Sequence, residues 1–140
     1  MLHNNLSDVI SGINTVVLTK YGEGTHSFQT VNKKSIVDGF TTNPSLMRAS
    51  GAKNYKEYSL KILKICKKKP ISFEVFADNE KEILKQAYQI NSWAKNVYVK
   101  VPVANSKGNF KGKIIKELNN QNIKLNITAV YNACLLYTSP

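Results

Sequence analysis

The sequence is poor in cysteine and has no long apolar run. Its two cysteines, Cys66 and Cys134, lie far apart and without metal-ligand spacing, so neither a disulfide framework nor a zinc site is indicated. No apolar stretch approaches the roughly 18 residues of a membrane span, and the N-terminus lacks the layout of a signal peptide. We therefore expect a cytoplasmic protein with no membrane partner, no metal and no cofactor.

Acidic residues are also scarce: 20 lysines and arginines against 9 aspartates and glutamates give a formal net charge of +11. Such a charge suits a nucleic-acid binder. However, the basic residues are spread along the whole chain, and Arg48 is the only arginine, the residue type that binds guanine and phosphate bidentately. We expect no nucleic-acid partner. A basic RNA-binding module remains an alternative that would require the lysines on one surface and Lys100 exposed.

What the sequence does contain is an alternation of strand and helix patterns. β-branched and aromatic runs predict strands over residues 13–20, 37–41, 71–76, 97–101 and 123–130. Helical patterns fall between them, over residues 27–36, 45–49, 54–68, from 78 or 79 to 93, and 107–119. Strict alternation predicts an α/β fold of parallel β/α units, either an open doubly wound sheet or a barrel.

Lys100 is a lone amine in the apolar run from Val97 to Val103. An ammonium in an apolar interior loses hydration worth several kcal/mol, and the usual relief is a lowered pKa that leaves a neutral, nucleophilic amine. Two interpretations follow from the pattern alone. Lys100 is either a reactive lysine or a strand-end lysine whose ammonium reaches solvent.

The strand alternation favours a barrel with a polar mouth. If helices cover the fully apolar face of each strand, the polar side chains all point to one interior near the C-terminal ends of their strands. The end at which they meet is where a (β/α)8 barrel keeps its active site. The side chains concerned are Asn43, Glu74, Lys100, Asn126 and Thr128.

Four ordered motifs carry a family resemblance over about residues 36–131. They are T-T-N-P-S within Asp38–Leu46, S-x-E-V at Ser72–Val75, V-K-V-P at Val99–Pro102 and N-I-T-A at Asn126–Ala129. This order is similar to that of the transaldolase family. The resemblance implies a (β/α)8 TIM-type barrel that moves a dihydroxyacetone unit from a ketose phosphate to an aldose phosphate. The ketose would be of the sedoheptulose 7-phosphate or fructose 6-phosphate type, in the pentose phosphate pathway.

The resemblance also implies roles for individual residues. Lys100 matches the Schiff-base nucleophile, and Glu74 and Thr128 match the pair that holds the catalytic water. Substrate binding falls to Asn43, Asn126 and Thr41. The fructose 6-phosphate aldolase branch, which releases free dihydroxyacetone, typically has Gln where this chain has Glu74. Glu74 therefore favours the transferase, and the aldolase remains an alternative.

Two departures from the family pattern concern the ends of the chain. The family has a catalytic aspartate at the end of its first strand, but residues 18–24 offer only Glu23, which is either a substitute or an exposed turn residue. Residues 133–140 differ from the helix expected there, and the family's phosphate-binding Ser and Arg come after the fifth strand. We expect one partial barrel domain of about five β/α units. Residues 1–35 are divergent, 36–131 carry the motifs, and 133–140 are a truncated or non-native end. As written, the chain is expected to be poorly stable or aggregation-prone and to have little activity, and whether its parent is a homo-oligomer stays open.

Overall fold

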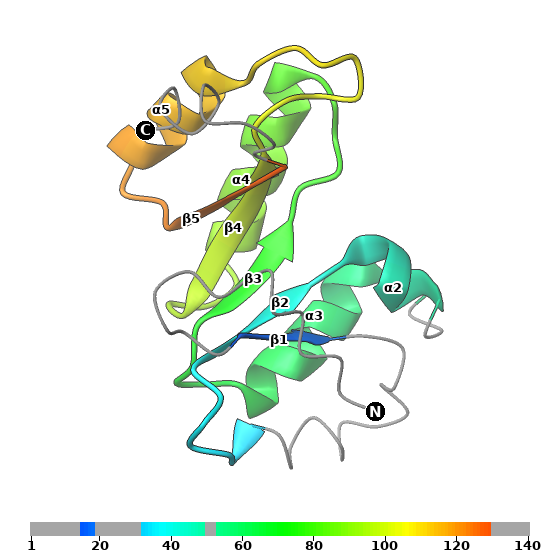
Figure 1. Ribbon diagram of the computed structural model, residues 1–140, viewed down its shortest axis with the longest axis vertical. Helices are drawn as coiled ribbons and strands as arrows, with labels where there is room; N and C mark the ends of the chain where they lie inside the picture. The colour runs from blue at the N-terminus through cyan, green and yellow to red at the C-terminus, as the bar shows by residue number, and fades with distance from the viewer. Residues whose placement is uncertain (1–14, 19–31, 50–52, 130–140) are drawn as a thin grey trace. The chain divides into compact units, whose positions relative to one another are not determined.

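The computed structural model describes residues 15–18, 32–49 and 53–129 (Figure 1). The chain divides into two compact units, Met1–Phe73 and Glu74–Pro140. Glu23, Cys134 and the predicted non-native end lie outside the described residues. The prediction of a single partial barrel domain stays a prediction.

Strands and helices alternate as the sequence predicts. The elements are β1 (Thr15–Leu18), β2 (Gly39–Thr42), α2 (Pro44–Ala49), α3 (Tyr55–Ile65), β3 (Ile71–Glu74), α4 (Glu80–Asn91), β4 (Val97–Pro102), α5 (Gly112–Asn120) and β5 (Leu125–Thr128). Hydrogen-bonded neighbours in the sheet follow chain order, β1-β2-β3-β4-β5. The pairs β1/β2, β2/β3 and β4/β5 are parallel. These features confirm an α/β fold of parallel β/α units.

In the first unit, backbone contacts between β2 and β3 depend on a glycine. A Cβ added to Gly39 would lie 3.0 Å from the carbonyl oxygen of Pro70, so a side chain would crowd the backbone here. The next residue, Phe40, donates its N–H to that same oxygen at 2.9 Å. The absence of a side chain at position 39 thus lets the start of β2 lie close against the chain that leads into β3.

Helix α3 begins and ends where its polar groups find partners. The Asn54 side chain caps the helix by accepting the Glu57 N–H at 3.1 Å. Ile62 and Leu63 are buried, and the last hydrogen bond runs from Cys66 N–H to the Ile62 carbonyl at 2.9 Å. The helix therefore ends at Ile65, three residues before the predicted end.

In the second unit, β4 separates apolar from polar side chains by strict alternation. Its valines at 97, 99 and 101 are at most 1% exposed, whereas Tyr98, Lys100 and Pro102 are half-buried. Apolar residues of α4 and α5 supply further buried side chains of this unit, namely Ile83, Ala87, Ile90, Ile114, Ile115 and Leu118. The alternation of faces predicted for β4 is confirmed.

Helix α5 is shorter than predicted because the loop before it has its own hydrogen bonds. The sequence predicts a helix from residue 107, but α5 begins at Gly112. The Asn105 side chain accepts N–H bonds from Lys107 at 3.0 Å and Asn109 at 2.8 Å, which closes a tight turn. Gly108 takes a positive φ of 79° there, and Lys111 N–H donates to the Val103 carbonyl. These bonds hold the backbone in a conformation that a helix could not share.

Turn structure also replaces part of another predicted helix. Of the residues expected to be helical over 27–36, those described after residue 32 are not helical. Within the described part of the chain, no helix is both long and apolar enough to cross a membrane.

Candidate functional site

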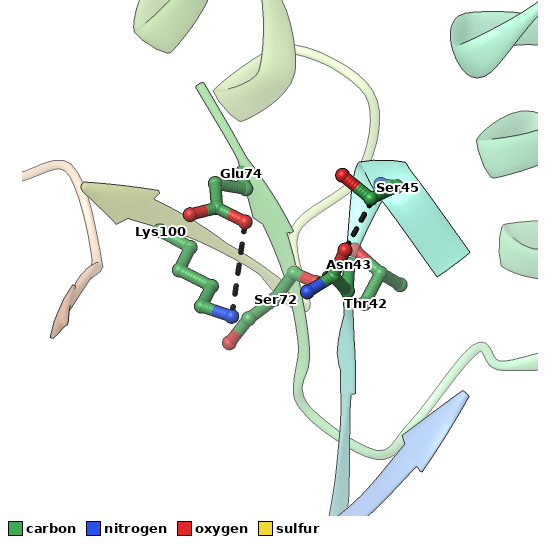
Figure 2. Close-up of polar contacts among 6 residues, drawn as sticks. All are labelled: Thr42, Asn43, Ser45, Ser72, Glu74 and Lys100. Carbon is green, nitrogen blue, oxygen red and sulfur yellow. Dashed lines mark hydrogen bonds and ion pairs between the residues drawn. The ribbon is translucent and has the colours of Figure 1, made fainter. Parts of the chain in front are cut away.

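The candidate site centres on an amine and a carboxylate from neighbouring elements of the second unit. Lys100 lies on β4, and Glu74 is the last residue of β3. Their charged ends point toward each other, with 3.8 Å between Lys100 Nζ and Glu74 Oε2 (Figure 2). The side chains are 16% and 20% exposed, so both groups are largely covered while remaining reachable from outside.

Backbone pairing fixes where Lys100 stands. The Lys100 carbonyl accepts the N–H of Val75 at 3.1 Å on one side. On the other side, Val99 N–H donates to the Lys124 carbonyl at 2.8 Å. The backbone that carries the Lys100 amine is therefore hydrogen-bonded to the chain on both sides of β4.

Two further predicted site residues lie on the strand beside Lys100. The register pairs Lys100 with Asn126 and Pro102 with Thr128. Register partners on adjacent parallel strands point to the same face, and Thr128 follows Asn126 by the two residues that return a side chain to that face. Asn126 and Thr128 are both half-buried. The structure thus brings together Glu74, Lys100, Asn126 and Thr128.

The surroundings of Glu74 favour its neutral form. Burial raises the pKa of this carboxyl, and the nearby Lys100 ammonium offsets only part of the rise. At 3.8 Å the two charged atoms are farther apart than a direct hydrogen bond allows. Glu74 can therefore hold a proton at a higher pH than an exposed glutamate and lies close enough to the amine to exchange one through a water.

The first unit holds the other two predicted binding residues, Thr41 and Asn43. Thr41 pairs in register with Ser72, and its neighbour Thr42 donates its hydroxyl to the Ser72 carbonyl at 2.8 Å. Asn43 accepts the N–H of Ser45 at 2.9 Å through its side-chain oxygen, as the Asn-Pro start of a helix predicts (Figure 2).

The Thr41 hydroxyl is a polar group in need of a partner. Thr41 is 7% exposed, and its Oγ1 has no hydrogen-bond partner within the part of the chain that the structure describes. A buried hydroxyl left unbonded costs about 1–3 kcal/mol, so such a group is a candidate for binding a polar ligand.

The predicted residues fall into two groups. Glu74, Lys100, Asn126 and Thr128 belong to the second unit, and Thr41 and Asn43 to the first. That both groups face one interior stays a prediction, as does any role of Glu23. Over residues 15–18, 32–49 and 53–129, no cluster of three or more His, Cys, Asp or Glu side chains is arranged to hold a metal ion.

Sequence reasoning missed a polar contact between the loops that follow β3 and β4. Asp78 accepts hydrogen bonds from both the hydroxyl and the N–H of Ser106. These bonds, chiefly the one from the hydroxyl, hold the Asp78 pKa below its usual range. Lys111 is buried at 6% exposure, and burial lowers its pKa against the opposing charge of Asp78. No local sequence pattern indicated this contact, because the loop that carries Ser106 is held by hydrogen bonds to the Asn105 side chain that appear only in the structure.

This chain is similar in sequence to known proteins of one family. Residues 24–136 match the transaldolase/fructose-6-phosphate aldolase family. A protein of Herpetosiphon aurantiacus named "Probable transaldolase" is 38% identical over 98 residues, which is 70% of this chain and 42% of that protein.

Two further proteins with the same printed name give similar figures. The one from Dehalococcoides mccartyi is 35% identical over 71% of this chain and 44% of its own length. The one from Thermoplasma volcanium is 37% identical over 69% of this chain and 42% of its own length. The chain thus spans less than half the length of these relatives, and it belongs to the transaldolase/fructose-6-phosphate aldolase family.

Proposed function

We propose that the protein carrying this chain is a transaldolase. It transfers a dihydroxyacetone unit from a ketose phosphate to an aldose phosphate through a Schiff base on Lys100. The observation that carries the proposal is the largely covered amine of Lys100, 3.8 Å from a carboxylate whose pKa is raised by burial. Membership of the family supports the same reaction. We place the enzyme in the pentose phosphate pathway and in the cytoplasm.

The reaction begins with addition of the Lys100 amine to the ketose carbonyl. The nitrogen lone pair attacks C2, and the carbonyl oxygen takes a proton to become the hydroxyl of a carbinolamine. Loss of that hydroxyl with a proton releases water and leaves a protonated imine. In the next step the C3–C4 bond breaks, its electron pair moves into the imine to form an enamine, and the aldose phosphate departs.

The second half of the reaction restores the enzyme. The enamine carbon attacks the aldehyde carbon of the acceptor and forms a new C–C bond, which returns the imine. Water then adds to the imine, and the amine leaves as the new ketose phosphate is released. A base must remove the C4 hydroxyl proton during cleavage, and Glu23 is the carboxylate that we propose for that step.

Glu74 and Thr128 are proposed to manage the protons of imine formation. Burial raises the pKa of Glu74, so this group holds its proton to a higher pH than an exposed glutamate and can take part in proton transfer beside Lys100. The separation of Glu74 Oε2 and Lys100 Nζ suits one water bonded to both. In this proposal the Thr128 hydroxyl, on the same strand face as Asn126, is a second partner of that water.

Substrate orientation is proposed for Asn126, Asn43 and Thr41. Asn126 is the register partner of Lys100, so its amide can bond a hydroxyl of a ketose whose C2 is attached to that lysine. The unpartnered Thr41 hydroxyl and the Asn43 amide supply further polar groups for the dihydroxyacetone hydroxyls.

Chemical trapping tests the nucleophile. The intact protein is incubated with fructose 6-phosphate, reduced with borohydride, digested and mapped by mass spectrometry. We expect a reduced adduct on Lys100 that disappears in Lys100→Met and persists in Lys113→Met, which changes an exposed lysine of α5. An adduct that maps elsewhere, or no adduct at all, contradicts the proposal.

Acceptor dependence tests the transferase assignment. With fructose 6-phosphate alone, we expect little free dihydroxyacetone, and with an added aldose phosphate we expect turnover to a new ketose phosphate. Release of dihydroxyacetone at an equal rate without acceptor would assign the chain to the aldolase branch instead. Because trapping does not depend on the acceptor, the two experiments separate the nucleophile from the reaction type.

A further inference from the structure

A pocket lies in the Glu74–Pro140 unit. It has a volume of about 290 Å³ and is lined by side chains from the end of α4, the start of β4 and the chain entering β5. Its polar lining includes Asn91, Lys95, Asn122 and Lys124, and Val97 is an apolar member.

The pocket lies at the opposite end of β4 from the catalytic lysine. Val97 is the first residue of β4, and Lys100 follows three residues later. At a rise of about 3.3 Å per residue, their backbones are about 10 Å apart along the strand. The side chains of Val97 and Lys100 also point to opposite faces, so this pocket is separate from the Schiff-base site.

Lys124 is held in place at this pocket. Its Nζ donates a hydrogen bond to the Lys95 carbonyl at 2.7 Å. The same atom lies 5.6 Å from the centre of the Tyr98 ring, within the range of a cation–π contact. An ammonium carries three donors, so the bond to Lys95 leaves the exposed Lys124 able to bind another acceptor.

The charge of the pocket is positive. Two lysines line it, and none of the described lining residues is acidic. The C-terminal carbonyls of α4 contribute roughly half a negative charge, less than the two full charges of Lys95 and Lys124. Asn91 and Asn122 add amide groups that can donate to an anion. The volume lies at the lower limit of ordinary ligand pockets, which suits a small anion better than a cofactor.

We propose that this pocket binds a phosphate dianion, either free phosphate or the phosphate group of a small monoester. Lys95 and Lys124 supply the charge, and the side-chain amides of Asn91 and Asn122 supply polar contacts. The proposal does not rest on the transaldolase reaction.

Lysine footprinting tests the proposal residue by residue. The full chain is treated with a limiting amine-acetylating reagent, once in inorganic phosphate and once in sodium chloride of equal ionic strength, and acetylation of each lysine is quantified by mass spectrometry. At phosphate concentrations ten times the dissociation constant, we expect acetylation of Lys95 and Lys124 to slow about tenfold. Lys113 and Lys116, exposed on α5, should react equally in both salts.

A variant and a second anion complete the experiment. Lys124→Met should abolish the phosphate protection of Lys95, whereas Lys113→Met should preserve it. Methyl phosphate in place of inorganic phosphate shows which source binds more tightly, and protection by either anion supports the pocket. Equal acetylation of Lys95 and Lys124 in phosphate and chloride overturns the proposal, and so does protection of Lys95 that survives Lys124→Met. Schiff-base trapping on Lys100 is scored separately, so failure of one proposal leaves the other testable.

Discussion

Glu74 is the residue whose proton the proposed chemistry depends on most. Replacing it by glutamine keeps the size of the side chain but removes its acid–base function. We expect Glu74→Gln to lower kcat by about 10²- to 10⁴-fold, the usual worth of a positioned general acid or base. Steady-state kinetics of the intact protein measure the effect. Glu117→Gln, a matched change at an exposed position of α5, should leave kcat unchanged.

The raised pKa of Glu74 also makes stability depend on pH. Because the folded state holds this proton more tightly than the unfolded chain does, the stability from Glu74 is fully present below its ordinary pKa of 4.5. It is lost as pH rises through the higher folded pKa. Urea unfolding between pH 4 and pH 8 should show the wild type losing stability relative to Glu74→Gln with rising pH. A constant difference across that range would contradict the assignment.

Lys111 is a buried cation for which burial is the main cause of a lowered pKa. Methionine has a similar length and no charge, so Lys111→Met removes the cost of burying the ammonium. The main-chain bond from position 111 to the Val103 carbonyl is kept. We expect the free energy of unfolding at pH 7 to rise by about 1 kcal/mol.

The pH dependence of that gain separates charge from packing. In the folded wild type, Lys111 is deprotonated at a pH below 10.5, its ordinary pKa. In the unfolded chain, Lys111 still holds its proton at that pH. Wild-type stability therefore rises with pH in this window, and the advantage of Lys111→Met should shrink between pH 7 and pH 10. An advantage that stays constant would mean that packing, and not the buried charge, is responsible.

At the scale of the element, the loop between β4 and α5 is tied to the loop after β3. Asp78 accepts both polar hydrogens of Ser106, and Asn105 closes the turn that presents them. We expect Asp78→Asn to speed amide hydrogen exchange over residues 103–111 severalfold, because its side chain is a weaker acceptor than a carboxylate. Asp78 has a lowered pKa, so its contribution is present above its ordinary value of 3.8 and is lost as pH falls through the folded value. Exchange that is unchanged at pH 6 would contradict this role.

The strands could be predicted from sequence more reliably than the loops. Val97, Val99 and Val101 alternate with less apolar residues in the sequence. The structure has the same period of two, because one face of the strand is buried and the other is not. The start of α5 could not be predicted in the same way. Residues 107–111 have no strong helix breaker beyond Gly108, and the competing bonds of Asn105 become visible only with coordinates.

The same contrast applies to the candidate site. The sequence predicts that the side chains of Lys100 and Glu74 point to the same interior, and the ion pair between them is consistent with that prediction. Lys111 looked like one more surface lysine, because its burial depends on a loop that local pattern does not specify. Burial of a single side chain is a tertiary property, so lysines of similar sequence context end with different roles.

At the scale of the whole molecule, the chain contributes parallel β/α units of the (β/α)8 barrel that its family adopts. It spans less than half the length of its relatives, so the substrates and the reaction proposed above refer to the intact protein. Within the described residues, β1 and β5 are the outermost strands in the sheet order. Unpaired strand edges promote association, so we expect the 140-residue chain alone to self-associate more readily than a protein of the relatives' length, as light scattering can check.

The strict alternation of buried and half-buried side chains along β4 also limits the positions that a reactive lysine can occupy. Only positions 98, 100 and 102 present side chains to the polar face, and successive positions are about 6.6 Å apart. Moving the reactive lysine to a neighbouring position on this face therefore displaces it by about 6.6 Å along the strand. Small shifts of a bound sugar cannot make up that distance. A redesign that moves the lysine to position 98 or 102 would select a substrate of different length and would not merely slow the reaction of the present one.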